Sequence, residues 1–116
     1  MSLRGIRGAT TVENNTKEEI IETTKELLTE MLSANRIKIE DIASIIFSVT
    51  KDLNAEFPAV AARELGWNDT ALLCTYEIDV SGSLPKCIRA LMHVNSEKKQ
   101  NEMKHVYLRG AQSLRR

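Results

Sequence analysis

The sequence has 116 residues, and its 16 Lys and Arg side chains are balanced by 16 Asp and Glu, so the formal net charge is zero. A chain of this length forms one domain with a modest core, and the charge balance argues against nucleic acid or an anionic membrane surface as the main partner. No apolar stretch approaches the ~20 residues of a membrane span, and the N-terminus lacks the apolar region of a signal peptide. With Cys74 and Cys87 expected as free thiols, we expect one cytoplasmic domain over residues 1–116, with no nucleic-acid or membrane partner.

The first half of the chain predicts a strand, a long helix and a second strand. Residues 2–12 form the first strand, and Thr16 then starts a helix with Glu19 three residues later, the pattern of a capping box. The apolar stripe of this helix ends near residues 34–35. Residues 42–49 are almost continuously apolar and β-branched, which is typical of a central strand covered on both faces.

The second half predicts a short helix and three more strands. Pro58 fits the first turn of a helix over residues 59–65, and Gly66 is a suitable residue to end it. The strands are expected over residues 71–76, 86–94 and 105–108. Residues 95–102 are expected to form a loop or a short solvated helix, and residues 110–116 a tail.

This order of elements predicts an α+β (mixed α/β) fold, a five-stranded mixed β-sheet with one long and one short helix on one face. Two helices cover only one side of five strands. We therefore expect the other side to be buried by another copy of the chain in a closed oligomer.

Two arginines interrupt segments that otherwise resemble sheet core. Arg7 follows Ile6 in the first strand, and alternation in the fourth strand separates Arg89 from the apolar face that contains Ile88 and Ala90. A guanidinium in such a place needs a partner, because stripping it of water is costly. The arginines indicate either a pocket for a small anion or structural salt bridges across a subunit interface, whereas Arg4 is interpreted as ordinary surface or interface charge.

A polar cluster at residues 74–77 adds further candidates, each with a simpler alternative. Cys74 and Glu77 are three residues apart, so they share one pocket only if the strand ends or bulges near Thr75. Otherwise Cys74 is a small core residue and Glu77 a solvated carboxylate. No spacing supports a Cys–His catalytic pair or a zinc site, and Tyr107 is by default a packed ring.

Taken together, the blocks around these residues resemble a known family. The sequence is similar to the small trimeric chorismate mutases first known from bacilli, over essentially the whole chain with one small gap. The matching blocks are residues 4–13, 57–59, 61, 63–65, 74 with 77, 79–80, 86–89, 105–108 and 114–115.

The resemblance implies a homotrimer that forms a pseudo-α/β barrel and rearranges chorismate to prephenate in aromatic amino-acid biosynthesis, with no cofactor and no metal. It implies that Arg89 donates hydrogen bonds to the ether oxygen whose bond breaks and to a carboxylate. Arg7 and Tyr107 are expected to bind carboxylates, and Glu77 with Cys74 to hold the ring hydroxyl. Arg89, Glu77, Arg7 and Cys74 are therefore the expected catalytic residues.

The same resemblance implies that the site lies between subunits. Phe57 and Arg63 are expected from the neighbouring subunit, and Arg115 from the tail that closes over the substrate. The further expected substrate contacts are Leu73, Thr75, Ala59 and Leu114. Three features depart from the family pattern: Val60 stands where a lysine is often found, the stretch over residues 64–67 is one residue shorter than in close relatives, and the chain ends one residue after Arg115.

An alternative remains open from the sequence. A non-catalytic binding module, or a trimer similar to the imine deaminases, also places arginines in clefts between subunits, so fold alone does not decide. The combination of Arg7, Glu77, Arg89 and Tyr107 favours the mutase interpretation.

Overall fold

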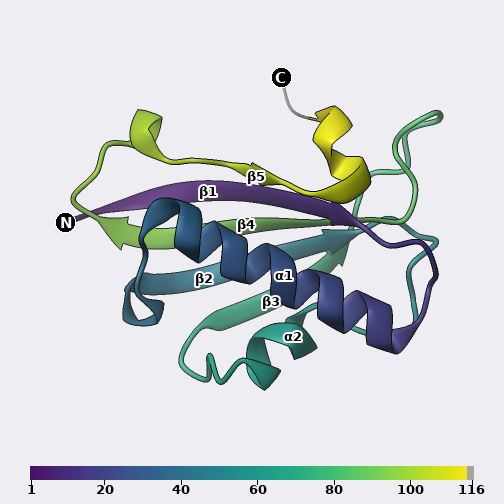
Figure 1. The fold of residues 1–116 in the computed structure, drawn as a ribbon, viewed down its shortest axis with the longest axis horizontal. Helices are drawn as coiled ribbons and strands as arrows, with labels where there is room; N and C mark the ends of the chain where they lie inside the picture. The colour runs from purple at the N-terminus through teal and green to yellow at the C-terminus, as the bar shows by residue number, and fades with distance from the viewer. Residues whose placement is uncertain (115–116) are drawn as a thin grey trace.

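A computed structural model describes residues 1–114, and it contains one five-stranded sheet with two helices packed on one side (Figure 1). The elements in chain order are β1 (Ser2–Thr11), α1 (Lys17–Asn35), η1 (Ile39–Asp41), β2 (Ile42–Val49), α2 (Ala59–Glu64), β3 (Ala71–Tyr76), β4 (Cys87–Ser96), η2 (Gln100–Glu102), β5 (Val106–Tyr107) and η3 (Arg109–Leu114), where η denotes a 3₁₀ helix. The predicted fold class is confirmed. No helix within residues 1–114 is long and apolar enough to cross a membrane.

The strands lie in the order β3-β2-β4-β1-β5, so β4 is central and runs antiparallel to both β1 and β2. The outer pairs, β2 with β3 and β1 with β5, are parallel. The sheet is therefore mixed, as predicted, and the two segments that carry Arg7 and Arg89 are direct neighbours across one ladder.

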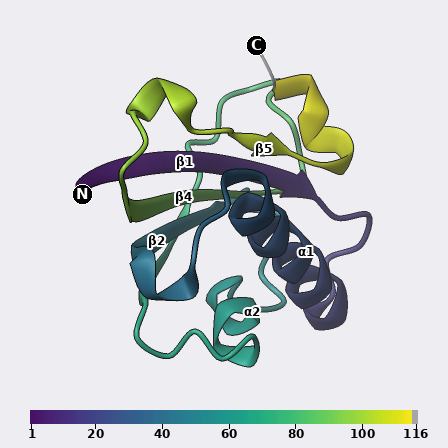
Figure 2. The same ribbon diagram turned by 60° about the vertical axis from the view of Figure 1, so that its left-hand side comes forward.

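The core lies between the sheet and the two helices, which occupy the same side of the sheet in both views (Figures 1 and 2). Ile6, Phe47 and Met92 point toward the helices from three different strands and are completely buried. Alternation on β4 holds as predicted, since Ile88, Ala90, Met92 and Val94 are all buried. Apolar residues at every second strand position thus fix which face meets the helices.

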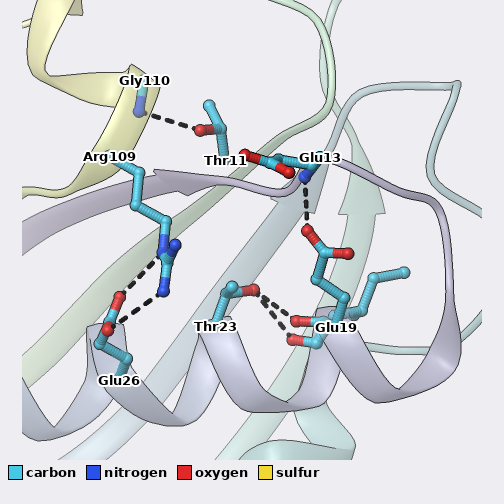
Figure 3. A network of polar contacts seen from close by, with 8 residues as sticks. Thr11, Glu13, Glu19, Thr23, Glu26, Arg109 and Gly110 are labelled. Carbon is cyan, nitrogen blue, oxygen red and sulfur yellow. Dashed lines mark hydrogen bonds and ion pairs between the residues drawn. The ribbon is translucent and has the colours of Figure 1, made fainter.

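The long helix begins where the sequence predicts it. Thr16 is the N-cap, and its hydroxyl accepts a hydrogen bond from the Glu19 N–H at 3.2 Å. The Glu19 carboxylate does not return to the cap residue, however. It accepts from the Glu13 N–H at 2.5 Å, which ties the end of the β1 segment to the helix (Figure 3).

Two expectations about the C-terminal third were incomplete. The β4 strand continues to Ser96 because it pairs with β1 to the end, where Ser96 lies opposite Ser2. The expected tail forms η3 up to Leu114. Arg109 turns the chain with a φ of 51°, the Gly110 N–H donates to Thr11 Oγ1 at 2.9 Å, and the Arg109 guanidinium pairs with Glu26 (Figure 3).

The face of the sheet turned away from α1 and α2, called the open face below, carries partly exposed apolar side chains. Leu91 is 37% exposed, Ile46 38% and Leu73 61%. The expectation that β2 is covered on both faces is met within one chain only on the helix side. Burial of the open face by another copy therefore stays a prediction.

Candidate functional site

A groove with a volume of about 470 Å³ lies on the open face, within the size range of small-molecule sites. Residues from β1, β2, β4, β5 and η3 form this open-face groove: Arg7, Gly8, Ala9, Ile46, Ser48, Arg89, Ala90, Leu91, Tyr107 and Leu114. Four of the site residues expected from the sequence line this groove: Arg7, Arg89, Tyr107 and Leu114. A fifth, Glu77, lies beside it and forms an ion pair with Arg89.

Strand register explains why residues so distant in sequence converge here. Ala9 of β1 lies opposite Arg89 of β4 on one side and opposite Tyr107 of β5 on the other. Directly paired residues point to the same face of a sheet, and so do residues two apart on one strand. Arg7, Arg89 and Tyr107 therefore all project from the open face.

Glu77 and Arg89 form an ion pair at the edge of the groove. Glu77 Oε1 lies 3.4 Å from Arg89 Nε, and the two side chains are 29% and 41% exposed. The Glu77 N–H donates to the Val49 carbonyl at 2.9 Å, which extends the pairing of β2 and β3 by one residue and places the carboxylate. Arg89 Nε is itself buried and makes no hydrogen bond to any residue within 1–114, whereas the Arg89 side chain as a whole is partly exposed and lines the groove.

The sequence interpretation missed Ser48. Its hydroxyl donates to Glu77 Oε1 at 2.6 Å, and its position on β2 is directly opposite Arg89. The signal was present in the sequence, because Ser44 and Ser48 alternate with Ile45 and Phe47 in an otherwise apolar strand. Two hydroxyls four residues apart lie on the same face of a strand and indicate that this face is not ordinary core.

Cys87 lies close to Arg89 but is buried rather than reactive. It packs with Ala9 and Ala111 under η3. Burial raises the pKa of the Cys87 thiol, and the nearby Arg89 charge opposes that effect. The side chain therefore stays a thiol at neutral pH, and its role is to seat η3 against the sheet.

The backbone of Arg7 is held by a histidine. His105 Nδ1 accepts a hydrogen bond from the Arg7 N–H at 2.9 Å. Burial lowers the pKa of His105, and the Arg7 charge lowers it further. The neutral ring, with its proton on Nε2, is thus the form that fits this position.

Four of the expected site residues lie outside the open-face groove. Cys74 is paired with Phe47, so its side chain points to the helix side, and burial raises the pKa of its thiol. Cys74 and Phe57 line a second hollow beside α2. On α2 itself, Ala59 is buried and Arg63 is exposed. One chain therefore does not bring Phe57, Ala59, Arg63 and Cys74 together with Arg7 and Arg89.

The remaining expected residues are on β3 and in the tail. Leu73 lies opposite Ile46 and Thr75 opposite Ser48, so both project from the open face beyond β2. Leu114 borders the groove from the end of η3, and Arg115 lies outside the described residues. Within residues 1–114, no three His, Cys, Asp or Glu side chains come together as metal ligands would.

Comparison with known proteins gives consistent matches over almost the whole chain. The family model described as chorismate mutase type I matches residues 3–116. The chorismate mutase AroH of Bacillus subtilis (strain 168) is 48% identical over 116 residues, covering 99% of this chain and 91% of that protein. The chorismate mutase AroH of Thermus thermophilus is 50% identical over 114 residues, covering 97% and 93%. The solved structure of a chorismate mutase from Clostridium thermocellum superposes with a TM-score of 0.93 at 59% identity, covering 94% of this chain and 97% of that one.

Proposed function

The chain belongs to the chorismate mutase type I family, and we propose that its reaction takes place in the open-face groove. The resemblance seen in the sequence is confirmed, and the chain is an isomerase that acts on chorismate. The observation that carries the assignment of the site is that the strand register places Arg7, Arg89 and Tyr107 on the same face of the sheet, with Glu77 paired to Arg89.

Chorismate offers groups that match these side chains. It carries two carboxylates, a ring hydroxyl and an ether oxygen, and it rearranges to prephenate by a pericyclic shift of its own electrons. No nucleophile, proton transfer or cofactor is needed for such a step. The protein's contribution is to bind the substrate in a folded pose and to stabilise the charge that develops.

Arg89 is placed to act on that charge. As the C–O bond breaks, negative charge builds on the ether oxygen, and a fixed guanidinium stabilises it where it develops. The partial exposure of Arg89 in the groove supports this role, because its guanidinium can donate hydrogen bonds to a ligand acceptor there.

The other groups orient the substrate. Arg7 and the Tyr107 hydroxyl bind carboxylates, and Glu77 accepts a hydrogen bond from the ring hydroxyl. Leu73 and Thr75 border the ring from β3, and Leu114 with Arg115 closes the site. Orientation of this kind removes part of the barrier, because the flexible arm no longer has to be ordered during the reaction.

The site is completed by a neighbouring subunit in a homotrimer. The partly exposed Ile46, Leu73 and Leu91 on the open face support burial against another copy, with the three sheets facing inward as a pseudo-α/β barrel. Phe57, Ala59 and Arg63 of the α2 region would then reach the groove of the adjacent chain, together with the segment around Cys74. The enzyme serves aromatic amino-acid biosynthesis in the cytoplasm.

The test is the loss of chorismate's diene absorbance on adding purified protein, with Arg89→Ala in parallel. Removing one preorganised donor lowers kcat by about 10²- to 10³-fold, and Arg89→Lys rescues weakly because lysine lacks the planar fork. Arg4→Ala is the matched control. Arg4 stands on β1, three residues before Arg7, and its Nε donates to the Lys98 carbonyl outside the groove.

Two outcomes would contradict this assignment. Near-full turnover by Arg89→Ala would remove Arg89 from the reaction. Stabilisation of the native protein by chorismate without turnover would favour the alternative of a binding module.

A further inference from the structure

We propose that Ser48 is a positioning residue that keeps Glu77 from forming a tight, doubly hydrogen-bonded pair with Arg89 in the free enzyme. The inference rests on the proposed function of the open-face groove. It concerns one oxygen atom, Glu77 Oε1, which lies between the Ser48 hydroxyl and the Arg89 guanidinium.

The two contacts made by this oxygen differ in strength. The Ser48 Oγ to Glu77 Oε1 distance of 2.6 Å is that of a charge-assisted hydrogen bond. The Arg89 Nε to Oε1 distance is 3.4 Å, and Nε makes no hydrogen bond within residues 1–114. The carboxylate is thus held near the guanidinium by attraction and kept from a tight pair by the serine.

The neighbourhood makes this arrangement unusual. Arginine and carboxylate side chains frequently form two parallel hydrogen bonds, as Arg109 and Glu26 do in this chain. Here Ser48 stands directly opposite Arg89 on the adjacent strand, so its hydroxyl approaches Oε1 from β2. Within residues 1–114, both close contacts of the carboxylate use Oε1, and Oε2 has no protein partner.

Two consequences follow for the reaction. The hydrogen-bond donors of Arg89 stay available for the substrate's ether oxygen, where they act most strongly as charge develops. The second Glu77 oxygen stays available for the ring hydroxyl. Without the serine hydroxyl, Glu77 would move onto Arg89, and the substrate would have to break that pair before the arginine could act.

The test compares Ser48→Thr with Ser48→Val, two β-branched side chains of the same shape that suit a strand. Only threonine keeps the hydroxyl. We expect kcat of Ser48→Val to be about tenfold below that of Ser48→Thr, the loss typical of one hydrogen bond to a charged group, with a smaller change in KM. Ser44→Ala is the control, because Ser44 lies on the same strand face but bonds to His93 Nδ1 at 3.0 Å; its kinetics should match the native protein.

Crystal structures of the two variants provide a second readout that a purely structural role would not change. In Ser48→Val, both Glu77 oxygens should approach the Arg89 guanidinium, whereas Ser48→Thr should keep the native arrangement. Equal kcat values for the two variants, or an unmoved Glu77 in Ser48→Val, would overturn the proposal. If Arg89→Ala retains turnover, the assignment of the groove fails instead, so the two failures are distinguishable.

Discussion

At Gly8, only the backbone of β1 separates the groove from the core on the helix side. Gly8→Ala should therefore destabilise the protein. Gly8 is buried on β1 between Arg7 and Ala9, and a Cβ built on it would lie 3.1 Å from Leu27 Cδ1 and closer still to Met31 Sδ. Ordinary carbon contacts are ~3.5–4.0 Å. Strand and helix would therefore have to separate, or both side chains leave their rotamers.

Overpacking of this kind costs about 1–3 kcal/mol. Met31 Sδ is near the end of a flexible side chain, but Met31 is fully buried and has little space to move. We therefore expect a loss of about 1–3 kcal/mol in the free energy of unfolding. The assay is urea unfolding followed by Trp67 fluorescence, since Trp67 is buried in the same core, at a fixed protein concentration because oligomerisation would add to the apparent stability.

Met31→Ala supplies the control. Alone it leaves a cavity and costs about 2–5 kcal/mol. Combined with Gly8→Ala it makes room for the new methyl, so the double variant should lose clearly less than the two single losses added together. Additive losses, or an unchanged midpoint for Gly8→Ala, would refute the reasoning that α1 packs on the bare backbone of β1.

Two more predictions concern the segments that flank the groove. Thr11→Val removes the acceptor of the Gly110 N–H while keeping the side-chain shape. We expect η3 and Leu114 to be held less firmly, so that KM rises by about two- to tenfold, which corresponds to the loss of one hydrogen bond. Thr11→Ser should behave as native, and an unchanged KM in the valine variant would contradict the role of this bond. His105 should make stability depend on pH. Because burial and Arg7 lower the pKa of the folded state below the ordinary 6.5, the unfolded chain binds a proton more readily, and the free energy of unfolding should fall as pH drops below about 6.5. Urea midpoints measured at pH 5.5 and 7.5 should differ less in His105→Gln, and equal pH dependence in both proteins would show that other groups are responsible.

Much of the fold was predictable from consecutive residues. The N-cap at Thr16, the end of α1 at Asn35, and the bounds of β2 and β3 agree with the sequence patterns. The alternation on β4 correctly separated Arg89 from the buried face. These features depend on near neighbours in the chain, through capping and through the period of apolar residues.

The site was only partly predictable. Family resemblance named Arg7, Arg89, Glu77 and Tyr107, whereas pattern alone left each arginine open between a ligand and a salt bridge. Ser48 was missed because its importance comes from the residue opposite it and not from its own segment. The opposite orientation of Cys74 and Thr75 follows from the regular strand that continues to Tyr76.

The sequence by itself determined which segments become helix or strand and which side chains alternate toward the core, because those properties are local. Only the tertiary structure decided that β4 lies at the centre, that Ala9 stands between Arg89 and Tyr107, and that Ser48 meets Glu77 beside Arg89. Strand order and register depend on packing between segments far apart in the chain. The free energy of that packing is not a property of any one segment.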